Sequence, residues 1–485
     1  MRILKLGLLG VLVLIGVLVY RTAQLRPSPQ APAVAPEALD ETAVAAHLAG
    51  AVQIPTVSYA DAAQIDGAAF TRLIDYLRTT FPHVDATLQH ETINGRSLLY
   101  IWPGQDAAQP PALFLAHLDV VPVEPGTEAA WTHPPFSGDI ADGYIWGRGA
   151  IDDKASAIAW FEALDKLAAE GFQPRRTLMF AFGHDEEIGG VNGAQKIAAL
   201  LHERGLKFEF ALDEGGVITR GVIPGVRRPV ASIMAAEKGY ASFRLTAHSA
   251  GGHSSMPPRA TAVGALAAAV TRLQAQPMPA RLAPPTTEML DRLAPEMPLV
   301  LRMAIANRWL FSPLLIHELG KAPVSDALLR TTTAPTLLRA GIKDNVLPSE
   351  AEAIVNFRLL PGDTVAGVTA HIRSVIADPD IAVEVYGEAA NEASPVADTR
   401  APAFALLARS VNEVFPDAVV SSGLVIGTTD LRNYAGLYDN RYNFVPTPLA
   451  PEDLARIHGT NERIGVADYA NIVRFYLRLL RNLNG

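Results

Sequence analysis

An alternation of apolar and amphipathic segments runs through the chain from Glu37 onward, and few folds are compatible with it. Short apolar runs separated by amphipathic stretches are typical of a sheet covered by helices. The predicted helices are long enough to connect neighbouring parallel strands, so we predict an α/β fold. The clearest strand patterns are 112–116, 178–182 and 208–212, and the clearest helix patterns are 155–169 and 193–203.

A second unit is predicted to begin near Glu237. Strand and helix patterns alternate there in an order that makes a small α+β module with one sheet and two helices. We predict that this module is inserted in the larger domain. The strand patterns are 240–246, 352–359 and 381–386, the helix patterns are 260–274 and 364–376, and the predicted domain segments are 38–236, 237–392 and 393–485.

Within this module, the segment 281–330 is apolar and helix-prone, and it contains Trp309 and Phe311. Ordinary helical core is the favoured interpretation. The alternative is a hydrophobic substrate wall or a membrane-facing patch, because a large exposed apolar surface usually marks a binding site.

The N-terminus has a different character from the rest of the chain. The run 6–20 carries no charge, and its length lies between a signal-peptide core and a full membrane span. We favour an uncleaved signal anchor at residues 1–22; the alternative is a signal peptide cleaved near 33–35, which would release a soluble exported protein. The Pro- and Ala-rich segment 23–37 would be a tether. Either way, the body is expected on the extracytoplasmic side, which is the periplasmic side in a bacterium.

Three counts restrict the chemistry. The chain has 485 residues, which is too many for one ordinary core. Its 50 acidic and 41 basic side chains give a net charge of −9 and no broad basic surface, so nucleic acid is an unsuitable partner. The chain has no cysteine, so a tightly held metal ion would need histidine and carboxylate ligands.

Histidines and carboxylates occur where the predicted strands end. His117 and Asp119 follow the strand 112–116, and the alternation of a strand end points both side chains the same way. A metal-bound histidine usually donates its other N–H to a carboxylate, and Asp119 is the natural candidate. Asp152 precedes the helix 155–169, where it could cap the helix or bridge two cations.

The next two strand patterns also end in acidic residues. Glu186 and Glu187 follow one of them and Asp213 follows the other, while His458 lies near the C-terminus. Adjacent carboxylates point in different directions, so one could bind metal while the other faces a water molecule. Open α/β sheets bind ligands at the carboxyl ends of their strands. The pattern therefore predicts a metal site at this edge of the sheet.

These motifs resemble those of the co-catalytic zinc peptidases related to aminoacylase, acetylornithine deacetylase and glutamate carboxypeptidase. Within that family, the chain resembles most closely the branch of carboxypeptidase S and the N-fatty-acyl amino-acid synthase/hydrolases. The resemblance implies a mixed-sheet catalytic domain with helices on both faces and an inserted, smaller α+β lid domain. The segments that carry it are 117–119, 149–154, 185–190, 213–216, 236–240, 252–258, 427–432 and 457–464.

The resemblance also implies a ligand set for two zinc ions, with cobalt or manganese as substitutes. Glu186 would be the general base, and Asp119 would orient the first histidine. One ion would be held by His117, Asp152 and Asp213, and the other by Asp152, Glu187 and His458.

Further residues would contact the substrate. The lid would bring His253 to the carbonyl oxygen, Asn345 to the substrate and Arg358 to a carboxylate, because a guanidinium matches a carboxylate with two parallel hydrogen bonds. Gly427 and Thr428 would form a substrate-contact loop.

The implied reaction is hydrolysis of the amide bond in N-acyl amino acids or small peptides that have a free carboxylate. A dipeptide carboxypeptidase is the alternative among enzymes, and a non-catalytic, membrane-tethered binding protein is the alternative from another class. A homodimer formed through the lid is a further expectation.

Overall fold

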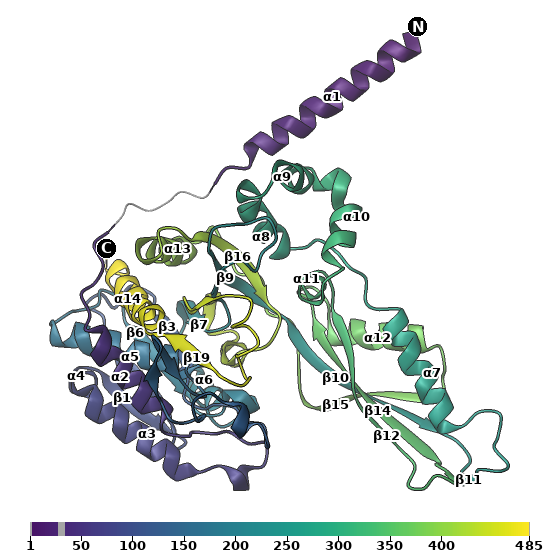
Figure 1. The fold of residues 1–485 in the computed structure, drawn as a ribbon, viewed down its shortest axis with the longest axis horizontal. Helices are drawn as coiled ribbons and strands as arrows, with labels where there is room; N and C mark the ends of the chain where they lie inside the picture. Colours follow the sequence, from purple (N-terminus) through teal and green to yellow (C-terminus); the bar gives the residue numbers. More distant parts are fainter. Residues whose placement is uncertain (1, 28–33, 485) are drawn as a thin grey trace.

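The structure of the protein is a computed structural model that describes residues 2–27 and 34–484. A long N-terminal helix, α1 (Arg2–Gln24), extends away from a body that contains two large, separate sheets (Figure 1). Part of the predicted tether 23–37 and part of the candidate cleavage site 33–35 lie outside the described residues.

The larger sheet has ten strands and is mixed, as predicted. Strand β3 runs parallel to β6 and β7, whereas β2 runs antiparallel to β6. The strand order is β1 (Gln89–Ile93), β2 (Ser97–Trp102), β6 (Leu178–Gly183), β3 (Ala112–His117), β7 (Phe208–Asp213), β17 (Tyr438–Asn443), β9 (Val230–Glu237), β8 (Ile218–Thr219) and β18 (Pro448–Leu449), with β16 (Val419–Val425) paired to β9.

Helices cover both faces of this sheet. In β3, Phe114 packs toward one face and its neighbours Leu113 and Leu115 pack toward the other. Because both faces are buried, the strand is apolar throughout instead of alternating. The first face is covered by α2 (Glu41–Val52), α3 (Gly67–Thr80), α4 (Pro82–Thr87), α5 (Lys154–Ala169), α13 (Pro402–Val414) and α14 (Val466–Asn482), and the second by α6 (Ala194–Glu203).

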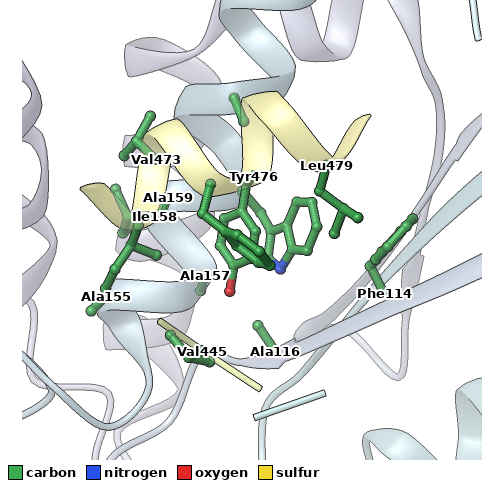
Figure 2. Close-up of a cluster of buried hydrophobic side chains, with 14 of the residues drawn as sticks. Phe114, Ala116, Ala155, Ala157, Ile158, Ala159, Val445, Val473, Tyr476 and Leu479 are labelled. Carbon is green, nitrogen blue, oxygen red and sulfur yellow. The ribbon is translucent and has the colours of Figure 1, made fainter. Parts of the chain in front are cut away.

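The contact between α5 and α14 lies at the centre of the core (Figure 2). Trp160 of α5 stacks on Tyr476 of α14 with ring centroids 3.7 Å apart, and the Tyr476 hydroxyl lies 2.8 Å from the Ser156 hydroxyl. Helix α5 begins directly after Asp152 and Asp153. Its packing therefore helps to fix the position of Asp152, one of the predicted ligands.

The smaller sheet lies within the segment 237–392 that is predicted to be an inserted module, and it has its own buried cluster under two helices. A fourth strand, β12, was not predicted, because most of its side chains are exposed at the sheet edge and show no alternation. The order is β12 (Thr332–Ala340), β14 (Glu350–Leu359), β10 (Gly239–His248) and β15 (Ile381–Asn391), covered by α7 (Ala262–Ala275) and α12 (Val365–Ile376).

The apolar segment 281–330 forms four short helices between the two sheets. Leu290, Ile305 and Leu315 make a small core among them, as the helical-core interpretation requires. Other apolar side chains of the same helices remain exposed. The helices are α8 (Thr286–Leu293), α9 (Leu299–Ala306), α10 (Arg308–Leu319) and α11 (Pro323–Ala327).

Candidate metal centre and active-site cavity

His117 is the last residue of β3, and Asp119 orients its ring. His117 Nδ1 lies 3.0 Å from the Asp119 carbonyl oxygen and 3.3 Å from a carboxylate oxygen of the same residue. The Asp119 carboxylate also accepts hydrogen bonds from the backbone N–H groups of Glu186 and Glu187, at 3.1 and 3.2 Å. One buried carboxylate thus fixes both the histidine and the turn that carries the paired glutamates.

Asp152 lies between the two histidines. One of its carboxylate oxygens is 3.1 Å from His117 Nε2, and the other is 3.0 Å from His458 Nε2. His458 Nε2 is also 3.3 Å from the Glu187 carboxylate. Two imidazole nitrogens on separate oxygens of one carboxylate are the arrangement expected where that carboxylate bridges two cations.

Glu187 has an orphaned atom that suits a cation. Its Oε1 is buried and has no hydrogen-bond partner among the residues that the structure describes. Such an atom costs free energy unless a donor or cation approaches it. Ligand atoms of His117, Asp152 and Glu187 lie within 4.8 Å of one another, and so do those of His117, Glu186 and Glu214. The residues therefore fit a pair of divalent cations.

The structure brings Glu214, and not Asp213, to His117. A carboxylate oxygen of Glu214 lies 3.7 Å from His117 Nε2. The two oxygens of Asp213 accept hydrogen bonds from the backbone N–H groups of Glu214 and Leu431, each at 2.9 Å. Asp213 remains a predicted ligand, and Glu214 is a second candidate for the same position.

The charges at this centre are unbalanced. Burial raises the pKa of Glu186 well above its ordinary value; His117 opposes the rise and Asp430 adds to it. Burial and the neighbouring Asp152 likewise raise the pKa of Glu214, again against His117. Hydrogen bonds that His458 donates to Asp152 and Glu187 raise the pKa of its imidazole to about 10. Divalent cations would supply the missing positive charge and displace protons from these groups.

Glu462 connects the two loops that carry Asp152 and His458. Its carboxylate accepts hydrogen bonds from the backbone N–H groups of Gly149, Ile151 and Asp152, at 3.0, 2.8 and 3.2 Å. The carboxylate also accepts a 2.5 Å hydrogen bond from Arg148, whose guanidinium donates to the His458 carbonyl oxygen at 3.0 Å.

This pair also supports an unusual backbone conformation. His458 has a φ of 60°, in the left-handed region that costs a non-glycine residue about 1–3 kcal/mol. The hydrogen bond from Arg148 to its carbonyl oxygen stabilises that conformation. Glu462 and Arg148 are both buried, so the distance between Asp152 and His458 depends on an ion pair shielded from water.

A cavity of about 1110 Å³ opens beside this centre. Glu186, Glu187 and His458 line one part of it, and three predicted substrate contacts, Arg358, Gly427 and Thr428, also line it. Arg432, Lys238 and Arg441 contribute further positive charge to the lining. The cavity therefore joins a carboxylate-rich metal centre to a wall that carries guanidinium groups.

The other two lid residues lie elsewhere, contrary to the expectation that this lid would bring them to the substrate. His253 is in β11 (Gly252–His253), which pairs with β13 (Val346–Leu347) beside Asn345. Both His253 and Asn345 are exposed at the far tip of the small sheet, and neither lines the cavity (Figure 1). The reason is geometric, because the tip projects away from the large sheet.

Several residues of the site were not singled out from the sequence. Glu214, Glu462 and Arg432 all lie within the segments that carry the resemblance, next to residues that were assigned roles. Their positions could have been flagged on that ground. Arg148 lies just before the segment 149–154 and not within it, and its pairing with Glu462 joins parts of the chain that only the fold brings together.

Comparisons with known proteins show which family the chain resembles. Residues 113–482 match the model of peptidase family M20/M25/M40. The chain is 40% identical over 448 residues to a probable carboxypeptidase S-like protein of Dictyostelium discoideum, covering 92% of this chain and 86% of that protein. It is also 40% identical over 441 residues to the N-fatty-acyl-amino acid synthase/hydrolase of Bos taurus, covering 90% and 86%.

A solved structure shows the same fold. The M20 family metallo-carboxypeptidase of Sulfolobus solfataricus superposes with a TM-score of 0.66 at 19% identity, covering 92% of this chain and 100% of that one.

Proposed function

The chain belongs to peptidase family M20/M25/M40, a family of metallopeptidases and amidohydrolases, and we propose that it hydrolyses the amide bond of N-acyl amino acids that carry a free carboxylate. Arg358 carries the substrate part of this proposal. One terminal nitrogen of its guanidinium is buried without a hydrogen-bond partner among residues 2–27 and 34–484, on the cavity wall. A buried, unpartnered guanidinium N–H is well matched to a carboxylate ligand.

The surroundings of Arg358 support an anion at this place. Its guanidinium lies 4.8 Å from the centre of the Tyr240 ring, which fixes its plane. Burial lowers the pKa of Arg358, Tyr240 opposes this, and the neighbouring positive charge of Arg432 lowers it further. The two positively charged guanidinium groups repel each other, and a carboxylate bound between them would offset this repulsion.

The acyl part of the substrate has an apolar surface available. Ile188 and Val191 follow the paired glutamates, line the cavity and are partly exposed. A fatty or aromatic acyl group would bury this surface, at about 25 cal/mol per Å² of apolar area. A dipeptide would instead place a charged amino group nearby.

The predicted ligands would hold two divalent cations, zinc in the first place. Asp152, Glu187 and His458 would hold one, and His117 and Asp152 would hold the other together with Asp213 or Glu214. When bound, the cations would polarise the amide carbonyl and lower the pKa of an attacking water molecule.

The protein's own residues would move the proton. Glu186 would take it from the water molecule and transfer it to the leaving amine. A carboxylate that lines the cavity beside the candidate cation ligands is placed for this double role. Asp119 would hold His117 and the Glu186 turn in register throughout, and Arg358 would hold the substrate carboxylate.

The substrate assignment can be tested with matched pairs. Each N-acyl amino acid is compared with the dipeptide that differs mainly by a free amino group. We expect a higher kcat/KM for the N-acyl member of each pair, with activity lost on chelation and restored by zinc. A consistent preference for the dipeptides would replace this proposal with a dipeptide carboxypeptidase.

The third ligand of the His117 ion is decided by two variants. Asp213→Asn and Glu214→Gln remove one negative charge each from neighbouring positions. The variant that retains only one metal ion per chain identifies the ligand, and the other should retain two. If both variants keep two ions, neither carboxylate is required.

A homodimer would give the lid tip a role. Strand β12 is an edge of the small sheet, and its Leu338 is exposed. Unpaired strand edges and exposed apolar residues favour association with another chain. We propose that a second subunit pairs with this lid, and that His253 and Asn345 then reach the cavity of the partner. Mass measurement by light scattering tests the dimer itself.

For the N-terminus, we propose an uncleaved membrane anchor. The 22-residue stretch Ile3–Gln24 of helix α1 is long and apolar enough to cross a bilayer. The most apolar part of this stretch is not buried by the body. The body would then lie on the extracytoplasmic side. N-terminal sequencing of the protein extracted from membranes would find Met1 or Arg2 if the helix is retained, and a residue beyond 22 if it is cleaved.

A further inference from the structure

The outer side of α9 and α10 carries an exposed apolar surface, here called the α9–α10 surface. Val300 is 77% exposed and Leu310 is 43% exposed. Trp309 is also exposed, unlike the other four tryptophans, which are buried. An exposed tryptophan among leucines is typical of a membrane–water interface, because its ring is apolar and its N–H is polar. The surface comprises Leu299, Val300, Leu301, Trp309, Leu310 and Leu314.

Helix α1 is attached to these same helices. Asn307, between α9 and α10, donates a hydrogen bond to the Leu18 carbonyl oxygen at 3.1 Å. Arg21 donates to the Ala306 carbonyl oxygen at 3.2 Å, and Thr22 is buried in the contact. Leu25 packs on the core of the four short helices. The C-terminal end of α1 is therefore fixed beside the α9–α10 surface, while the rest of α1 projects outward (Figure 1).

The free length of α1 is too short to span a bilayer. Residues 3–17 are exposed, and contacts with the body begin at Leu18. Fifteen helical residues measure about 22 Å at 1.5 Å per residue, whereas the hydrocarbon core is about 30 Å thick. The remaining turns of a spanning helix would have to come from 18–24, where Leu18, Arg21 and Thr22 contact Ala306 and Asn307 of the body. A membrane deep enough to cover α1 would therefore reach α9 and α10.

We infer that the α9–α10 surface inserts into the outer face of the lipid bilayer beside α1. This inference rests on the proposed anchor for its geometry. Helices α9 and α10 are bent by 118° at Asn307, so they would lie on the membrane and not form a straight span. The contact would hold the body at a fixed orientation to the lipid, and not merely on a loose tether.

The chain has no cysteine, so single cysteine substitutions give unique sites for a fluorescent label. Leu12→Cys reports on α1, and Val300→Cys and Leu310→Cys report on the proposed surface. Val263→Cys is the matched control, because Val263 is an apolar residue of α7 with 45% exposure, far from α1 in the fold (Figure 1). Each full-length variant is labelled and placed in phosphatidylcholine vesicles with or without bromine on the acyl chains.

Brominated chains quench only labels that lie in the hydrocarbon. We expect loss of fluorescence at Leu12, Val300 and Leu310, and none at Val263. Loss at Leu12 alone would refute the inference and leave the anchor standing. Loss at Val300 and Leu310 alone would refute the anchor and retain the surface contact. No loss of fluorescence at any site would refute both the surface contact and the anchor. A blue shift without quenching would lead to the same conclusion, because it would mean that a second copy of the chain covers the surface.

Discussion

The candidate metal centre and the lid tip both contain residues that the sequence motifs predict to be functional. The fold brings the residues of the metal centre together beside the cavity, but it leaves those of the lid tip away from it. At the candidate metal centre, His117 comes from the end of β3, Asp152 and His458 come from two separate loops, and both histidines lie within 3.1 Å of the Asp152 carboxylate. At the lid tip, His253 and Asn345 lie together but exposed and away from the cavity. The large sheet brings its candidate ligands together within one chain, whereas His253 and Asn345 of the lid tip would need a partner subunit or a movement to reach a cavity.

The largest expected effect concerns Glu186 at the candidate metal centre. Glu186→Gln keeps the size of the side chain and removes the base, so kcat should fall by about 10²–10⁴-fold. The metal content should remain at the wild-type value. Glu162→Gln is the control, since Glu162 is a largely buried carboxylate paired with His47 outside the cavity. Unchanged hydrolysis by Glu186→Gln would remove Glu186 from the mechanism.

The second prediction concerns the lid tip. If His253 stabilises the oxyanion, His253→Ala should reduce kcat by about 10²–10³-fold without changing the fold of the free chain. Equal kcat values for His253→Ala and the wild-type protein would leave the lid tip without a catalytic role.

Mixing two inactive variants shows which subunit supplies His253. Chains of Glu186→Gln and His253→Ala are unfolded and refolded together. If the histidine acts in the partner's cavity, mixed dimers contain one intact site and recover part of the activity. If it acts within its own chain, every site stays defective and no activity returns.

The third prediction asks whether the metal centre is preassembled by Glu462. Glu462→Gln weakens the ion pair with Arg148 that positions Asp152 and His458. Apparent metal affinity should fall by about 10- to 100-fold, as for other residues that orient ligands. Chelator competition measures the affinity, and addition of zinc should restore kcat. Glu209→Gln, which removes the ion pair with Arg176 away from the site, is the control. Equal affinities would show that Glu462 has no positioning role.

The smallest effect concerns Arg358, a lid residue that does reach the cavity. Arg358→Lys keeps the charge but loses the paired donors, so KM should rise by about tenfold while kcat changes little, since about 1.4 kcal/mol of binding is lost. Arg244→Lys is the matched control, because Arg244 stacks at 4.9 Å on Tyr386 of the same sheet and does not line the cavity. A similar KM in both variants would contradict the carboxylate assignment.

Sequence patterns predicted the buried parts of this fold well. Strands β3, β6 and β7 and helices α5 and α6 begin and end within about two residues of the predicted limits, because burial imposes a clear apolar pattern. The exposed edge strand β12 left no such pattern. The mixed character of the sheet was implied by the resemblance, whereas the inserted module was predicted from its own alternation of strand and helix patterns.

Some features of the candidate site could be predicted from the sequence, and others could not. His117 and Glu187 follow strands that end at one edge of the sheet, so the strand pattern predicted that they would meet. Asp152 precedes a helix and His458 lies in a turn near the C-terminus, and their place in the same ligand set was implied by the resemblance. The choice between Asp213 and Glu214 depends on side-chain directions at one strand end, which spacing does not define. The position of His253 depends on how a whole module is oriented, and no local pattern encodes that.

The central claim is that this chain holds two metal ions on either side of Asp152. Anomalous diffraction from crystals of the zinc-loaded protein tests it most directly. We predict two peaks per chain a few ångströms apart, one beside His117 and the other beside Glu187 and His458, with Asp152 between them. A single peak, no peak, or peaks away from Asp152 would contradict the account.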